Sequence, residues 1–194
     1  MDRVAAALLL VFGCAVGLKL PDFDHSFRWL PLIDHRSLLT HSLLVPLLVL
    51  YAVRRQLGRE EGTPARLMLM GMGLGIAVHL AFDLFAGRWS GYALLHVPFY
   101  GRLGGGASRF LLLAGVLGGL YLSCRLLRST GDLALALLSL AVLYGVSAAA
   151  QPHLSFYALV TLVPAALLAF VLPPRSTTAG RHDGAATGAG ANAL

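Results

Sequence analysis

The stretch GMGLGIAVHLAFDLFAG, residues 71–87, decides the fold, because it places two ionisable side chains inside an apolar run. The run extends over residues 67–86, and about 20 apolar residues are what one transmembrane helix requires. His79 and Asp83 are four residues apart, so both lie on one face of a helix. Such groups are costly at membrane depth unless they are paired or hydrated. We therefore predict a transmembrane helix with a functional pair; the alternative is a His–Asp hydrogen bond that only joins helices.

The composition favours a membrane protein over a soluble domain. Of the 194 residues, 57% are hydrophobic and 12% are charged, and the mean hydropathy is +0.75. Soluble domains carry about 45–50% apolar residues. Because lipid offers no hydrogen bonds to the backbone, the apolar runs are expected to be helices. We predict an all-α integral membrane protein, a bundle of six transmembrane helices, from the runs at residues 4–20, 38–53, 67–86, 110–124, 133–150 and 154–172.

Two short runs and the chain ends complete this organisation. The second and fourth runs are short for a span, and Ser37 and a snorkelling Arg125 can extend them. The start, MDRVAAALLLVFGCAVG, has the outline of a signal peptide, but no A-x-A-like cleavage site follows, so we expect a retained helix. Cys14 and Cys124 fall in apolar runs and predict no disulfide framework. Residues 1–172 are therefore expected to form one polytopic membrane domain, and residues 173–194, rich in Gly, Ala and Thr, a disordered tail.

The positive charges predict the orientation. The formal net charge of +6 is nearly all arginine, and the arginines flank the apolar runs, so they indicate membrane lipids as partners and no nucleic acid. When six helices are counted from the N-terminus, nine Lys and Arg residues fall on one side and six on the other. This excess predicts both termini in the cytoplasm. The end of the first helix, the start of the second and the end of the third then share the other membrane face.

A second polar cluster is expected to meet His79 and Asp83 on that face. Residues 20–44, LPDFDHSFRWLPLIDHRSLLTHSLL, contain three aspartates and three histidines, namely Asp22, Asp24, Asp34, His25, His35 and His41. Carboxylates and imidazoles suit zinc, and also manganese or iron; a hydrolytic site needs about three protein ligands and an open position for water. Asp34 has an alternative role as the N-cap of the second helix. His96, in the loop after the third helix, is either a ligand or a residue of the lipid interface.

Four blocks of the sequence stand in the order found in one bacterial family. LPDFDH, HRSLLTHSLL, GIAVHLAFDLFAG and HVPF, within residues 19–99, resemble the YdjM-like family of bacterial inner-membrane proteins described as metal-dependent hydrolases. The resemblance implies that the metal-binding residues are Asp22, Asp24, His35, His41, His79 and Asp83. Around them we expect accessory roles for His25, Thr40, Ser42 and His96, and Arg36 falls on the motif arginine. The helical His-x-x-x-Asp pair is also similar to one in zinc-dependent phospholipase C, which favours phosphate esters as substrates.

These observations lead to one leading hypothesis and two alternatives. We expect a membrane-bound metal-dependent hydrolase with one or two divalent ions, zinc first, that acts on a phosphoester or lipid-linked substrate at the membrane interface. Asp24 is the expected general base, and Arg36 would offset the charge of an anionic substrate. The alternatives are a metal or proton transporter or channel, with His79 and Asp83 as relay groups, and a non-catalytic membrane scaffold. The last three runs carry no charged residue in mid-span, which disfavours a transport path.

Overall fold

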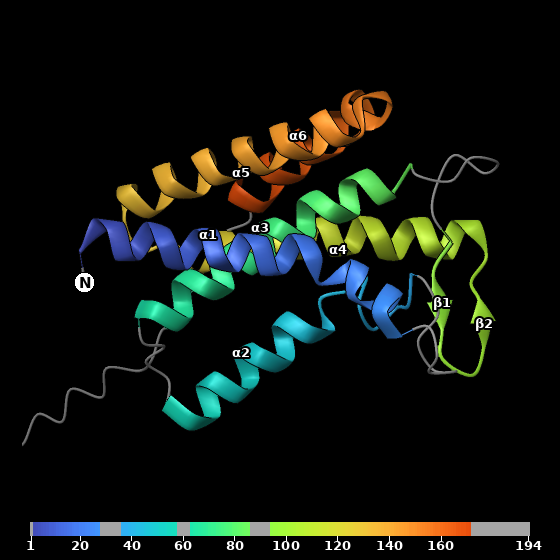
Figure 1. The fold of residues 1–194 in the computed structure, drawn as a ribbon, viewed down its shortest axis with the longest axis horizontal. Coiled ribbons are helices and arrows are strands. Elements are labelled where there is room, and N and C mark those ends of the chain that lie inside the picture. Colours follow the sequence, from blue (N-terminus) through green and yellow to red (C-terminus); the bar gives the residue numbers. More distant parts are fainter. Residues whose placement is uncertain (1, 28–35, 58–62, 86–93, 172–194) are drawn as a thin grey trace, which may run out of the picture.

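The computed structural model describes residues 2–27, 36–57, 63–85 and 94–171. Within these residues the chain forms six α-helices, two 3-10 helices and one two-stranded hairpin (Figure 1). In chain order they are α1 (Arg3–Lys19), η1 (Pro21–Phe27), α2 (Leu44–Leu57), α3 (Thr63–Asp83), β1 (His96–Val97), β2 (Gly101–Arg102), α4 (Gly105–Arg125), α5 (Thr130–Ala150), η2 (Pro152–Leu154) and α6 (Ser155–Val171). The predicted tail at 173–194 lies outside the described residues.

Four of the helices are long and apolar enough to cross a membrane. These spans are Pro64–Asp83, Gly105–Arg125, Thr130–Ala150 and Pro152–Val171, which correspond to α3, α4, α5 and the joined η2 and α6. By contrast, α1 has 17 residues and α2 has 14, so both are shorter than a full span. The prediction of a helical bundle with six helices is confirmed. The prediction that all six are spans is not confirmed.

The start of α2 differs from the prediction. The apolar run predicted from residue 38 becomes helical only at Leu44, and residues 36–43 form turns instead. Pro46 then lies in the first turn of α2, where its missing N–H removes no helical hydrogen bond. The hydroxyl of Ser42 accepts a hydrogen bond from the Leu44 N–H at 3.2 Å. Asp34, the residue considered as an N-cap, lies outside the described residues and well before this start. The predicted boundary was wrong because the residues before Leu44 make turn hydrogen bonds instead of helical ones. The Thr40 and His41 N–H groups donate to the Ser37 carbonyl, and the Ser37 N–H donates to Asp24.

The central element of the bundle is α3. It lies between α1 and α4, with α5 and α6 above them in the view of Figure 1. Within an 18-residue apolar segment of each span, 83% of the residues are buried for α3, against 11% for α5 and 28% for the last span. Ile76 and Leu80 on α3 are 0% exposed. The helix that carries the ionisable pair is thus the one most enclosed by protein.

Backbone contact between α1 and α3 takes the place of side-chain packing at four glycines. A Cβ added at Gly13 or Gly17 of α1 would overlap carbonyl oxygens of α3. A Cβ added at Gly71 or Gly75 of α3 would overlap backbone atoms of α1. Two Gly-x-x-x-Gly pairs therefore face each other, an arrangement that allows transmembrane helices to approach closely.

A buried ion pair holds the opposite end of α3. Arg66 Nη1 lies 2.6 Å from Asp132 Oδ2 and donates a hydrogen bond to the carbonyl oxygen of Leu126 at 2.7 Å. Asp132 also accepts from the backbone N–H of Arg128 at 2.9 Å. A buried carboxylate is tolerated only when it is paired and hydrogen-bonded in this way. The pair ties the start of α3 to the turn between α4 and α5.

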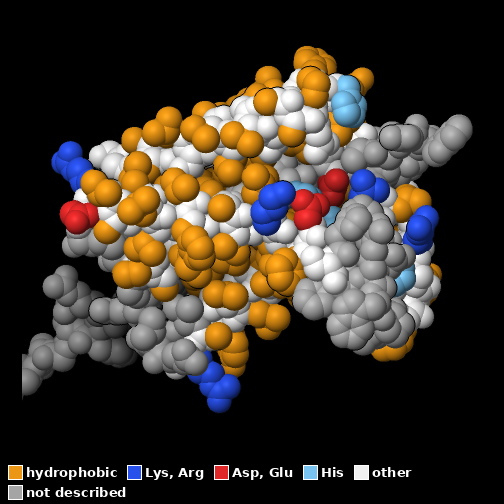
Figure 2. All heavy atoms as spheres, viewed as in Figure 1, with side chains coloured by type: hydrophobic (Ala, Val, Ile, Leu, Met, Phe, Trp, Pro, Cys, Tyr) orange, Lys and Arg blue, Asp and Glu red, His pale blue; other side chains and the backbone are white. Residues whose placement is uncertain are grey.

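The outer surface of the helices is apolar. Figure 2 shows hydrophobic side chains along the length of the bundle, whereas the charged side chains are few and include a group just right of the centre of the view. Exposed apolar residues include Leu138 and Val142 on α5 and Val160 and Leu167 on α6. An apolar surface of this extent is unfavourable in water. It is compatible with lipid around the four spans.

We expect Gly71→Ala to lower the free energy of unfolding by about 1–3 kcal/mol, because the new methyl group overlaps backbone atoms of α1. The matched variant Gly145→Ala on α5 has nothing within 4 Å of the added Cβ. Since alanine favours helix over glycine by up to about 1 kcal/mol, this control should be neutral or stabilising. Reversible SDS-induced unfolding in mixed micelles measures both. Equal stability of the two variants would contradict the close contact of α1 with α3.

Candidate metal centre

Two residues of the candidate site lie on the last turns of α3. His79 Nε2 is 3.3 Å from Asp83 Oδ2, and the side chains are only 14% and 16% exposed. The four-residue spacing puts both groups on one helical face. Two ionisable side chains therefore meet in a mostly enclosed position at one end of a span.

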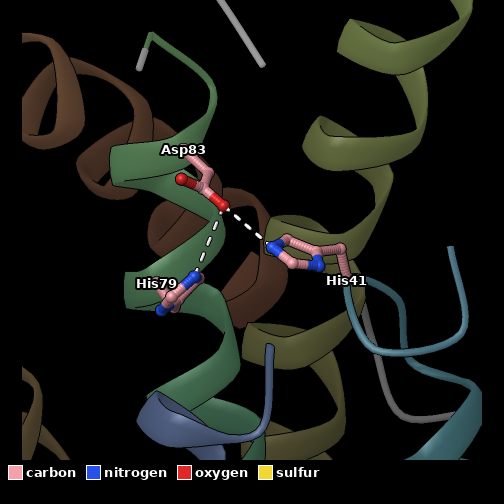
Figure 3. A group of neighbouring side chains, drawn as sticks. All are labelled: His41, His79 and Asp83. Atoms are coloured by element: carbon pink, nitrogen blue, oxygen red, sulfur yellow. Dashed lines mark ion pairs between the residues drawn. The ribbon is translucent and has the colours of Figure 1, made fainter. Parts of the chain in front are cut away.

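A third group reaches the same oxygen from the turns that precede α2. His41 Nε2 is 3.1 Å from Asp83 Oδ2, and the His41 side chain is fully buried. Figure 3 shows the carboxylate of Asp83 between the two imidazoles, with both ion pairs directed at one oxygen. The ring centroids of His41 and His79 are 5.7 Å apart at 70°. One ligand atom from each residue lies within 4.8 Å of the others, and we call this group the His41–His79–Asp83 cluster.

Asp24 of η1 holds His41 in place. Its side chain is 0% exposed, and its Oδ2 lies 3.4 Å from His41 Nδ1. The same oxygen accepts hydrogen bonds from the Ser37 N–H and from the Thr40 hydroxyl, both at 3.1 Å. Asp24 therefore closes the turns at 36–41 and faces the edge of the His41 ring that is opposite Nε2.

The backbone of α1 orients the second imidazole. His79 Nδ1 lies 3.0 Å from the carbonyl oxygen of Leu18. Because a carbonyl oxygen only accepts, Nδ1 carries the proton of this hydrogen bond. The remaining nitrogen, Nε2, is then directed at Asp83.

This arrangement makes the cluster a candidate cation site. If each ring is neutral and carries its proton on Nδ1, both Nε2 lone pairs are directed at one carboxylate oxygen. Lone pairs and a carboxylate repel unless a proton or a metal cation lies between them. Protons on both Nε2 atoms would make two His–Asp ion pairs that only join helices. A single divalent ion would satisfy all three groups at once.

Three charged side chains lie on the more exposed side of the cluster. Asp22 Oδ1 is 3.8 Å from His79 Nε2, and its side chain is 49% exposed. Arg36 Nη2 is 3.8 Å from Asp83 Oδ1, and its backbone has a φ of 63°. Lys19 lies 4.0 Å from Asp22. The approach to the cluster therefore offers one carboxylate and two cations.

The other predicted site residues have varied positions. His35 and the side chain of His25 lie outside the described part of the chain. The hydroxyl of Ser42 accepts a hydrogen bond from the first residue of α2. His96 lies in β1, where its backbone N–H donates to the Arg36 carbonyl at 2.9 Å and its carbonyl accepts from the Leu38 N–H at 2.8 Å. Its contribution, as the structure describes it, is to hold the turns that carry His41.

A separate cavity lies away from this cluster. It has a volume of about 580 Å³ and is lined mainly by apolar side chains of α3, α4, α5 and α6, among them Leu74, Leu120, Leu140 and Leu162. Leu74 faces the opposite side of α3 from Asp83, since nine residues turn a helix by about two and a half turns. The cavity therefore offers none of the groups of the candidate site.

No protein-family model, no curated protein and no solved structure matches this chain. The resemblance to the YdjM-like family, which depends on the four sequence blocks between residues 19 and 99, therefore stays a prediction.

Two parts of the site were not predicted from the sequence. The carbonyl oxygen of Leu18 has no signal in the side-chain pattern, because every residue carries one. The glycine pairs that bring α1 to α3 do have a signal, the Gly-x-x-x-Gly spacing of Gly13 with Gly17 and of Gly71 with Gly75. Attention to that spacing would have predicted which helix packs against the ionisable pair.

We expect Asp24→Asn to lower the free energy of unfolding by about 1–3 kcal/mol, because a buried acceptor of two hydrogen bonds is weakened. Asp22→Asn is the matched control: it is two residues away, half-exposed, and expected to change stability by less than about 0.5 kcal/mol. SDS-induced unfolding with a metal chelator present compares them without any contribution from bound ions. If the two variants were equally stable, Asp24 would not be the residue that closes the turns.

Proposed function

We propose that this protein is a membrane-bound metal-dependent hydrolase whose ion is held by His41, His79 and Asp83. We further propose that its substrate is a phosphoester of a lipid or a lipid-linked molecule, cleaved at the membrane interface. The resemblance noted above favours the bacterial inner membrane, and the charge count favours cytoplasmic termini.

One observation carries the proposal. The Nε2 atoms of two histidines lie 3.1 and 3.3 Å from the same oxygen of Asp83. His79 Nδ1 faces the Leu18 carbonyl, and His41 Nδ1 lies 3.1 Å from the Thr40 hydroxyl and 3.4 Å from Asp24 Oδ2. Histidine ligands of metals typically direct the second ring nitrogen to a carboxylate or a backbone carbonyl, which sets the tautomer and the ring orientation. Asp24 offers such a carboxylate to His41, and Leu18 offers such a backbone carbonyl to His79.

The donor set suits zinc best. Two imidazole nitrogens and one carboxylate are the ligand number and type of many catalytic zinc sites, in which a further position stays open. When bound, zinc supplies Lewis-acid chemistry and allows water to act as a nucleophile near neutral pH. Manganese or iron would use the same ligands. A second ion would require Asp22, the nearest further carboxylate that the described residues offer.

The neighbouring side chains have distinct proposed roles. Asp24 orients His41 from the far side of the ring, and this geometry supports a positioning role better than the general-base role expected from the sequence. Asp22, half-exposed beside His79, is the carboxylate better placed to take a proton from water. Arg36, next to Asp83, can bind the oxygen of an anionic substrate, because its guanidinium matches phosphate geometry.

The position of the cluster supports a lipid substrate. Asp83 is the last residue of the α3 span, so the cluster lies at one rim of the bundle rather than in its middle. The phosphates of lipids lie at that level of a bilayer. Between this rim and Arg66, the α3 segment from Leu67 to Val78 carries only apolar residues and glycine, so it offers no polar path across the membrane.

We expect the detergent-purified protein to bind about one zinc ion per chain, as judged by elemental analysis and chelator competition. Asp83→Asn and His79→Gln should each weaken zinc binding by at least about 100-fold, because each removes a ligand rather than a partner of a ligand. His153→Gln, in the exposed turn between α5 and α6, is the matched control and should bind as the unchanged protein does. Stoichiometric zinc in both cluster variants would exclude this cluster as the metal site.

A screen of phospholipids and polyprenyl phosphate esters in mixed micelles tests the reaction. We expect zinc-dependent release of product, its loss in Asp83→Asn, and a fall in kcat/KM of about 10–100-fold in Arg36→Gln, since one charge-assisted hydrogen bond to substrate is removed. The Arg36 effect should appear mainly in KM and should be absent with an uncharged ester. A zinc-binding protein that cleaves none of these esters and passes zinc or protons in proteoliposomes would contradict the proposal.

A further inference from the structure

A small β-hairpin projects the most exposed apolar side chains that the structure describes. Its strands β1 and β2 pair antiparallel, with His96 opposite Arg102. The turn between them presents Phe99 and Tyr100, whose exposed fractions are 94% and 77%. No other large hydrophobic residue in the described part of the chain is as exposed as these two.

The hairpin lies at the rim where the cluster is found. In Figure 1 it sits beyond the end of α4 that starts at Gly105 and runs crosswise to the helix axes, with its turn pointing away from α4. If the helices cross the bilayer, a hairpin in this position runs along the plane of the membrane. Its turn then lies beside the bundle, at the level of the lipid headgroups.

The turn holds Phe99 in an unfavourable backbone conformation and is closed by a hydrogen bond from the Tyr100 N–H to the Val97 carbonyl at 3.1 Å. Phe99 has a φ of 65°, in the left-handed region that glycine and asparagine adopt far more readily than a bulky residue. A ring that is 94% exposed gains almost nothing from contacts within the chain. A bulky exposed ring at such a position favours a role for that ring outside the chain.

We propose that the β1–β2 hairpin is an interfacial anchor, and that its partner is the boundary between headgroups and acyl chains of the bilayer. Aromatic rings are favoured at this level, and tyrosine in particular keeps its hydroxyl in the hydrated layer while its ring is in the apolar one. Exposed Arg102, at the base of the hairpin, supplies a positive charge for lipid phosphates.

The anchor is connected to the turns that carry His41. β1 is hydrogen-bonded to them on both sides of Ser37, through the Arg36 carbonyl and the Leu38 N–H. The depth of the hairpin in the bilayer therefore sets the level of Arg36 and of the turns at 36–41. The inference requires only that the helices span a bilayer, and it holds whether or not the cluster binds metal.

Tryptophan fluorescence in lipid nanodiscs tests the anchor. The native Trp29 and Trp89 are replaced by phenylalanine, and Phe99→Trp is introduced as the reporter. Lipids brominated close to the headgroup should quench it more strongly than lipids brominated near the chain end. Leu138→Trp, exposed in the middle of α5, should show the reverse order.

The same measurement can overturn the proposal. Quenching of the Phe99→Trp reporter by aqueous iodide but by neither brominated lipid would place the turn in water. Protection from iodide and from both lipids would place it against protein, a second copy or another chain, and would equally reject a lipid anchor. Tyr100→Trp with Phe99 retained repeats the test in case the first variant fails to fold, and it should give the same order of quenching.

Discussion

Close approach of two helix backbones is the constraint on which the rest of the structure depends. Glycines on the facing sides of α1 and α3 leave no room for a side chain, so carbonyl oxygens of each helix lie against the other. This contact brings the Leu18 carbonyl within hydrogen-bond distance of His79 on α3. It also places η1, which follows α1 directly, beside the last turns of α3. The position of Asp22 and Asp24 is thus a consequence of how closely two helices pack.

Contacts of η1 in turn fix the turns before α2. The carboxylate of Asp24 gathers the Ser37 N–H, the Thr40 hydroxyl and one edge of the His41 ring. His41 then reaches Asp83, which already faces His79. Each step depends on a buried polar group whose partner is supplied by another element, and such groups are expensive when left unpaired. The cluster is therefore an integral part of the packing and not an addition to its surface.

The sequence predicted the parts of this structure that follow from periodicity. The spacing of His79 and Asp83 placed them on one face, and the apolar runs located α3, α4, α5 and α6 to within a few residues. It could not place the start of α2, because the hydrogen bonds that keep residues 36–43 in turns come from Asp24, which is distant in the chain. The same limit applies to the partner of the His79 ring, a backbone carbonyl that no residue type reveals. The prediction that α1 and α2 are spans as well is not confirmed, since they have 17 and 14 residues against the roughly 20 of a typical span.

The central position of α3 has a consequence for how the chain is made. An ionisable residue lowers the tendency of a lone helix to pass from the translocon into lipid. α3 carries three, Arg66, His79 and Asp83, and most of its surface is enclosed in the finished bundle. The glycine-bearing helix that receives it, α1, is synthesised first and is already available when α3 leaves the ribosome. If these helices insert into a bilayer, the order of segments along the chain lets α3 pack against α1 as it enters, whereas a circularly permuted chain that began at α3 would lack this partner.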